Sequence, residues 1–139
     1  MVHNDATIAH NTNFVGERNR GDNVLLAPGQ TRKVDNLLPE SAPILIRCNI
    51  HPWMDAYARV VDTPYYAISK SDTLDGKNKV DKDSPEFGTY EIKNVPAGKV
   101  RIFVWHERAG WLNKEQGMGE VIEVKAAEAT TKNFELSAK

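Results

Sequence analysis

Short apolar runs separated by turn residues constrain the fold of this chain more than any other feature of its sequence. The runs have the roughly four to eight residues typical of β-strands, and Gly, Pro or Asp-Gly follows most of them. Sustained helical periodicity is not seen, so an all-β sandwich or barrel is predicted. The clearest candidate strands are 43–48, 57–61, 65–69, 89–93, 100–105, 121–125 and 133–136, and the weaker ones are 7–14, 23–26 and 31–34.

Length, charge and cysteine content limit the classes of protein to consider. A chain of 139 residues suits one domain or two very small ones. Its net charge is −1, without the basic stripe of a nucleic-acid-binding protein. Its apolar runs are too short to span a membrane, and the first residues lack the apolar core of a signal peptide. The single cysteine excludes an internal disulfide, so cysteine content does not identify the compartment.

The segment CNIHPWM (48–54) places a thiol, an imidazole and a thioether at intervals of three residues. Pro52 interrupts strand pairing, so we expect His51 and Met54 on a tight loop that folds back over the end of the preceding strand. A cysteine beneath two such loop residues is a plausible cradle for a soft metal ion. For an isolated cysteine, a buried and inert thiol is the more common case.

Side-chain alternation indicates that the sulfur points inward. In the run 43–48, Ile44 and Ile46 share one face of the expected strand with Cys48. His10 likewise shares a face with Ile8 and Phe14 in the run 7–14, and it is the best candidate for a second imidazole.

Two imidazoles, one thiolate and a distant thioether form the ligand set of a blue-copper electron-transfer centre. Zinc rarely recruits methionine, so a structural zinc site fits less well. His106 is expected to pack or hydrogen-bond near Trp105 and Trp111 instead. His3 would chelate Cu(II) only beside a free native amino terminus. The predicted ligands of one copper ion per chain are His10, Cys48, His51 and Met54.

Two stretches, CNIHPWM and the upstream AHNTNF (9–14), resemble the cupredoxin family. The ligand loop is most similar to the short Cys-x-x-His-x-x-Met loop of the amicyanin type. The resemblance covers about residues 5 to 62 and implies a Greek-key β-sandwich with a type 1 copper site that carries single electrons. It gives Asn11 the role of tying the first ligand strand to the cysteine loop. It also implies a periplasmic or secreted location, and a redox partner such as a c-type cytochrome or another copper protein.

Cupredoxins have strands before the first histidine ligand, whereas His10 lies almost at the start of this sequence. We therefore expect a sandwich that lacks the usual N-terminal strands. The C-terminal part of the chain or a partner chain would replace them, or the chain is a fragment. An uncovered sheet edge would favour self-association.

The stretch GTYEIKNVPAGKVRIFVWHE (88–107) resembles the carboxypeptidase-regulatory or transthyretin-like β-sandwich module. Such modules are usually structural or adhesive and carry no chemistry of their own. The resemblance implies two segments, a copper-binding one at 1–62 and a small β-sandwich at 63–139, which follows the first or merges with it.

Two other classes of function compete with electron transfer. A cysteine enzyme would use Cys48 as nucleophile and His51 as base, but such pairs are usually distant in sequence, and no Gly-rich oxyanion element flanks Cys48. A non-enzymatic function is therefore expected. The second alternative is a β-sandwich module that stores or hands over copper, or whose ligands are vestigial.

Overall fold

The computed structural model describes residues 1–73, 76–113 and 118–136, and within them the chain is all-β, as predicted. These residues contain no α-helix, only the 3-10 helix η1 (Gly76–Asn78). None of the described helical segments has the length and apolar character needed to span a membrane. The strands are β1 (Val2–His3), β2 (His10–Phe14), β3 (Asp22–Leu26), β4 (Thr31–Arg32), β5 (Ile44–Arg47), β6 (Asp55–Ala58), β7 (Gly98–Ile102), β8 (Trp105–His106), β9 (Gly110–Trp111) and β10 (Glu120–Val124).

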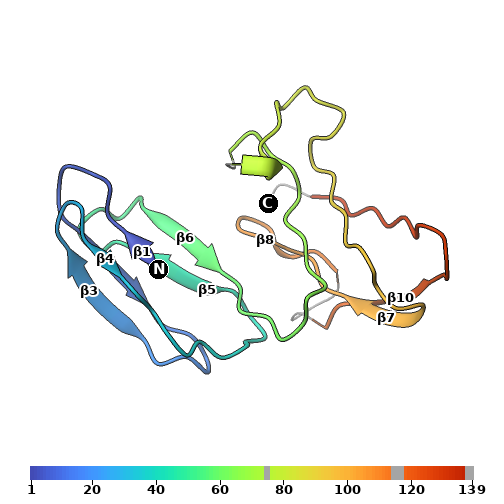
Figure 1. Ribbon diagram of the computed structural model, residues 1–139, viewed down its shortest axis with the longest axis horizontal. Coiled ribbons are helices and arrows are strands. Elements are labelled where there is room, and N and C mark those ends of the chain that lie inside the picture. Colours follow the sequence, from blue (N-terminus) through green and yellow to red (C-terminus); the bar gives the residue numbers. More distant parts are fainter. Residues whose placement is uncertain (74–75, 114–117, 137–139) are drawn as a thin grey trace.

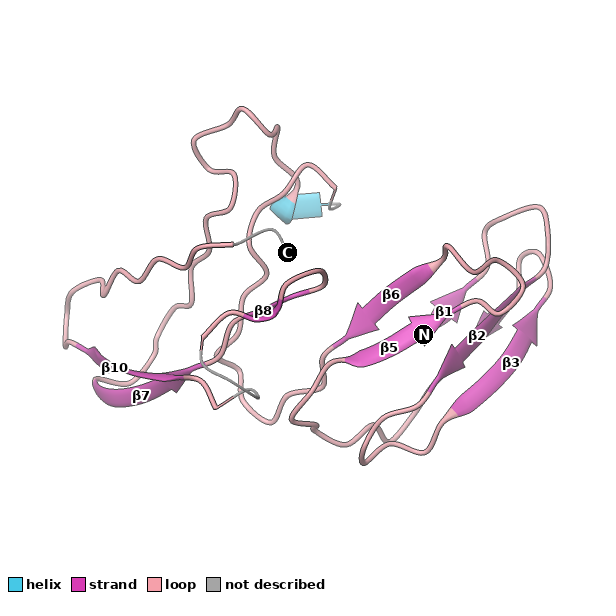
Figure 2. Cartoon of the chain, turned by 180° about the vertical axis from the view of Figure 1, so that it is seen from behind, coloured by secondary structure: helices cyan, strands magenta, loops and turns pink. Residues whose placement is uncertain are grey.

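The largest sheet contains four antiparallel strands in the order β3-β2-β5-β6 (Figures 1 and 2). Phe14 on β2 is opposite Ile46 on β5, and Arg47 is opposite Asp55 on β6. Because β2 and β5 run in opposite directions, the beginning of β2 lies beside the loop that follows β5. This register brings His10 to the same end of the sheet as the segment 48–54.

Apolar packing is concentrated on one face of this sheet. The buried apolar side chains of the described residues are Phe14, Leu26, Ile44 and Cys48. Because Leu26 is opposite His10 and Asp22 is opposite Phe14, His10 lies on the core face of β2. The inward directions predicted for Cys48 and His10 are therefore confirmed.

The short ribbon of β1 and β4 is attached to β3. Val2 is opposite Arg32 in this ribbon. The Asn4 side chain donates a hydrogen bond to the Leu26 carbonyl at 3.0 Å, and Arg32 forms an ion pair with Asp22. Edge strand β3 thus contacts a second layer of structure, whereas β6 is the other edge of the four-stranded sheet.

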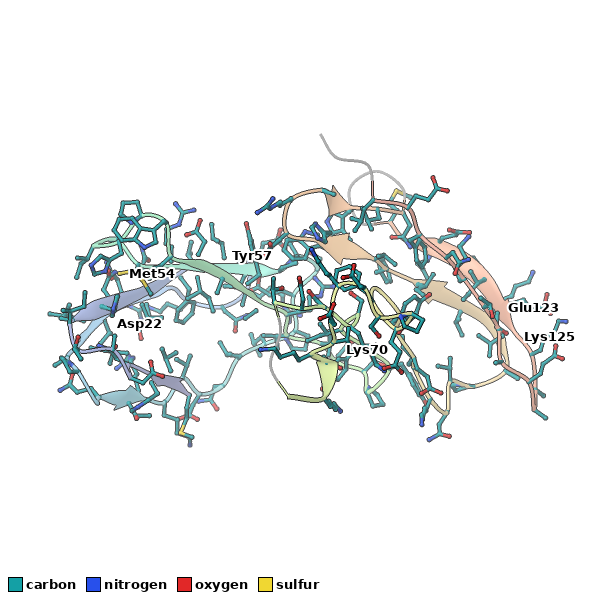
Figure 3. The ribbon with its side chains drawn as sticks, turned by 90° about the horizontal axis from the view of Figure 1, so that it is seen from above. Asp22, Met54, Tyr57, Lys70, Glu123 and Lys125 are labelled. Carbon is teal, nitrogen blue, oxygen red and sulfur yellow. The ribbon has the colours of Figure 1, made fainter. Side chains whose placement is uncertain are left out.

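The C-terminal part of the chain forms two antiparallel ribbons, β7 with β10 and β8 with β9. They lie at the opposite end of the molecule from the start of β3 (Figure 3). The ring of Tyr57 on β6 meets Trp105 edge-on, with 4.7 Å between ring centroids. The guanidinium of Arg59 lies 5.3 Å from the Trp111 ring centre. These contacts connect the β8–β9 ribbon to the four-stranded sheet.

Several predicted strands are absent or displaced. The runs 65–69, 89–93 and 133–136 form no strand, and 57–61 is replaced by Asp55–Ala58. Apolar alternation produces a strand only where a neighbouring strand supplies hydrogen bonds and packing. Conversely, Trp105–His106 and Gly110–Trp111 pair as a ribbon, although only Trp105 of these residues lies in a predicted strand. The predicted boundary near residue 62 falls between β6 and η1, and the division into two domains stays a prediction.

Candidate metal centre

The loop after β5 closes on itself and returns the chain to β6. The Met54 amide donates to the His51 carbonyl at 2.9 Å, and the Cys48 amide donates to the Met54 carbonyl at 3.0 Å. Cys48 and Met54 are thereby held opposite each other where β5 and β6 diverge. The segment between them, which contains Pro52, is a tight turn that carries His51 over the end of the sheet, as the sequence predicts.

Three predicted ligands meet at this end of the sheet. The Cys48 sulfur lies 3.8 Å from Nδ1 of His10 and 3.6 Å from Nδ1 of His51. The two Nδ1 atoms are 3.0 Å apart, and the rings are tilted by 50°. Cys48 is buried and both histidines are half-buried. Residues 38 positions apart along the chain therefore direct one sulfur and two nitrogens at the same small volume.

The spacing of these atoms fits a single metal ion. A circle through the three donor atoms has a radius of about 2.0 Å, close to typical zinc–nitrogen bonds of about 2.0–2.1 Å and zinc–sulfur bonds of about 2.3 Å. Cys48, His10 and His51 would therefore all reach a shared metal ion at ordinary bond lengths. The group could therefore hold one metal ion.

Met54, the fourth predicted ligand, is the most exposed of the set. Its side chain is 41% exposed, whereas Cys48 is 5% exposed. Figure 3 shows Met54 far from the C-terminal ribbons. The hydrogen bonds of the turn fix its backbone beside the cluster, and a role as axial ligand stays a prediction.

Asn11 connects β2 to the cysteine loop in the way the resemblance implies. Its Oδ1 accepts hydrogen bonds from the backbone amides of Asn49 at 2.7 Å and Ile50 at 3.3 Å. The same oxygen lies 3.3 Å from the Cys48 sulfur, within reach of a thiol proton. One amide oxygen thus ties the strand of His10 to the loop of Cys48 and His51.

The surroundings of Cys48 favour the thiolate. Burial alone would raise the pKa of this thiol. Hydrogen bonds from the backbone amides of Asn11 and His51 and from the His51 ring outweigh burial and lower the pKa below its ordinary value. The thiolate is the form that binds metals, so the site is electrostatically suited to one.

Exposed apolar side chains border the site. Trp53 is 78% exposed and Ile50 is 51% exposed, and the Trp53 ring centre lies 5.3 Å from that of His51. With Met54 they form an apolar rim on the loop, which we call the loop rim (Ile50, Trp53 and Met54). It lies where His51 approaches the surface.

The other two histidines lie in different surroundings. His106 is on β8 beside Trp105, and its Nδ1 accepts a hydrogen bond from the Arg108 amide at 3.2 Å. His3 is exposed, with Nδ1 2.8 Å from the Thr31 hydroxyl. In the described part of the chain, neither belongs to the group of possible metal ligands. Asn13 and Asn23, which hydrogen-bond to Asn49 and Asn11, were not predicted to support the site, because an asparagine in an expected strand has no special spacing.

No family model, curated protein or solved structure matches this chain.

Proposed function

We propose that this protein is a type 1 copper protein that carries single electrons between redox partners. The observation that carries the proposal is the convergence of the His10, Cys48 and His51 donor atoms within 4.8 Å of one another. One thiolate and two imidazoles with a nearby thioether make a ligand set that favours copper over zinc.

Each residue has a distinct part in this proposal. His10 and His51 would bind through Nδ1, Cys48 would provide the strong in-plane thiolate, and Met54 would be the weak axial ligand. Copper held there would supply a one-electron couple between Cu(I) and Cu(II). The hydrogen bonds at 2.9 and 3.0 Å that close the 48–54 turn would keep the ligands in place in both oxidation states.

The fold and setting of the protein belong to the same proposal. We infer a cupredoxin-like Greek-key sandwich without the usual N-terminal strands at 1–62, and a transthyretin-like segment at 63–139. The four-stranded sheet with its inward-facing His10 and Cys48 supports this assignment. A periplasmic or secreted location follows from the resemblance alone.

The partner would be a c-type cytochrome or another copper protein that docks on the loop rim. An exposed apolar surface with few charges suits brief contacts, because weak electron-transfer interfaces are among the smallest. His51 lies beside Trp53 in this rim, which gives a short path between the site and a docked partner. Self-association through a sheet edge stays a prediction.

A second candidate function is copper storage or handover. The exposure of Met54 favours it, because a residue that is 41% exposed is accessible to a competing ligand on a partner. A cysteine enzyme is less well supported, since Cys48 is 5% exposed and two imidazoles converge on its sulfur instead of one.

Repeated redox cycling separates these two candidates. The copper-loaded protein is cycled between a mild oxidant and ascorbate in the presence of a Cu(I) chelator. An electron carrier keeps its copper and gives the same spectrum after each cycle. Loss of copper to the chelator in the reduced state would instead establish handover, and Zn²⁺-loaded protein serves as the redox-silent control.

A further inference from the structure

Four asparagines form a side-chain network around the ligand loop. Asn11 Nδ2 donates a hydrogen bond to Asn23 Oδ1 at 2.7 Å, and Asn13 Nδ2 donates to Asn49 Oδ1 at 3.0 Å. Asn11 and Asn13 are on β2, Asn23 is on β3, and Asn49 follows Cys48. The network therefore extends from an edge strand of the sheet to the loop that carries three of the proposed ligands.

The amide orientation of Asn11 is dictated by its partners. Two backbone N–H groups, those of Asn49 and Ile50, point at one end of the amide, and that end must be the acceptor oxygen. The NH₂ end then points away from the loop. A rotation of the amide by 180° would place donors against donors and lose both hydrogen bonds.

Asn23 supplies the acceptor that this orientation requires. In the antiparallel register, Asn23 is directly opposite Asn13, so its contact with Asn11 is a diagonal one across the β2–β3 pair. Its Oδ1 is 2.7 Å from Asn11 Nδ2, a short hydrogen bond for neutral amides. Asn23 thus favours the rotamer of Asn11 that directs Oδ1 toward the loop.

We propose that Asn23 is a positioning residue for the metal centre and acts through Asn11. By accepting from Asn11 Nδ2, it holds Oδ1 on the amides of Asn49 and Ile50 and thereby fixes the loop between Cys48 and His51. The inference rests on the proposed function only in treating this loop as the ligand loop. The hydrogen-bond relay itself concerns residues outside the ligand set.

The test begins with the full-length, metal-free chain and needs no copper. Asn23→Ala removes the acceptor, and Asn23→Asp retains it. The amide hydrogens of Asn49 and Ile50 should exchange about two- to tenfold faster in Asn23→Ala, the range expected from one lost hydrogen bond. Asn23→Asp should restore wild-type exchange, and the NMR signals of the Asn11 side-chain NH₂ should lose their hydrogen-bonded shift only in the alanine variant.

A matched control separates positioning from general weakening of β3. Leu25 is on the same strand, directly opposite Asn11, and is 61% exposed. Leu25→Ala should leave exchange at Asn49 and Ile50 unchanged. Equal acceleration in Leu25→Ala, or unchanged exchange in Asn23→Ala, would overturn the positioning role.

The copper-loaded chain provides a second measurement. Asn23→Ala should shift the visible band and the reduction potential, and both shifts should persist at high salt. Any effect of the charge in Asn23→Asp on the potential should shrink as salt screens it. If wild-type protein shows no copper band, the proposed function fails, whereas the exchange measurements still decide the role of Asn23.

Discussion

At the scale of single residues, the imidazole rings of His10 and His106 have different neighbours, and the two residues should therefore differ in their effect on copper binding. His10 lies with Nδ1 3.0 Å from the His51 ring nitrogen, whereas His106 accepts a local amide hydrogen bond on β8. His10→Ala should lower copper affinity by more than the about 10- to 100-fold that changes to outer-shell partners cost. His106→Ala should leave affinity and spectrum unchanged. Copper titration followed by visible absorption measures both, and the reverse outcome would move the site to the C-terminal part of the chain.

Trp53 provides a second prediction at this scale. Because it is 78% exposed and its ring lies near His51, we expect it to contact a partner and not to support the loop. Trp53→Ala should leave the copper spectrum intact and slow electron exchange with a c-type cytochrome several-fold in stopped-flow measurements. Bleaching of the copper band would instead make Trp53 a support for the loop, and an unchanged rate would place the exit elsewhere.

The proposed ligands could be predicted from the sequence, whereas the residues that position them could not. Cys48, His51 and Met54 stand close together in the sequence. His10 completed the predicted ligand set, because a soft metal site of this kind needs a second imidazole and because His10 was expected on the inward face of its strand. Asn23 could not be predicted, because its contact with Asn11 depends on the β2–β3 register and on a diagonal contact across it. The types and spacing of residues in the sequence predict which side chains can be ligands, whereas the hydrogen bonds that orient those ligands depend on tertiary structure.

At the scale of elements, the loop between β2 and β3 depends on one carboxylate. Glu40 is buried and accepts hydrogen bonds from the backbone amides of Glu17, Arg18 and Asn19 and from the Asn19 side chain. Burial would raise the pKa of Glu40, but the Asn19 side chain and the three backbone amides lower it to about 2. The ionised carboxylate therefore holds this loop against the segment before β5.

The depressed pKa of Glu40 predicts a pH-dependent contribution to stability. In the unfolded chain this carboxyl has its ordinary pKa of 4.5. The contribution of its ionisation to the free energy of unfolding is therefore fully present above that pH. The contribution is lost as pH falls from 4.5 toward 2. Glu40→Gln should be less stable than wild type at pH 7 in urea unfolding, and the difference should shrink between pH 4.5 and 2. A constant difference across this range would show that ionisation of Glu40 does not matter.

The strands show where sequence patterns succeed and fail. The runs 43–48 and 121–125 contain real strands, because β5 pairs with both β2 and β6, and β10 pairs with β7. The run 65–69 has equally strong strand character, yet Tyr66 is 63% exposed and Ile68 is 59% exposed. Local propensity was similar in these segments. The presence of a partner strand, which depends on the whole chain, decided between them.

At the scale of the whole molecule, aromatic rings connect the two groups of strands. Tyr57 of β6 meets Trp105 of β8 edge-on at 4.7 Å, a geometry worth about 0.5–1.5 kcal/mol beyond surface burial. A double-mutant cycle with Tyr57→Ala and Trp105→Ala should give a coupling free energy of that size in denaturant unfolding. Additive effects of the two substitutions would mean that the rings do not pack together in solution.

The central claim, a copper–thiolate centre at the end of the four-stranded sheet, is tested most directly by the absorption and EPR spectra of the protein after addition of Cu(II). Wild-type protein should bind one copper ion and show an intense visible charge-transfer band from the Cys48 thiolate, with the small copper hyperfine splitting of a type 1 site. Cys48→Ser should abolish the band, because a hydroxyl is a poor soft ligand. A colourless wild-type complex, or an unchanged band in Cys48→Ser, would contradict the account.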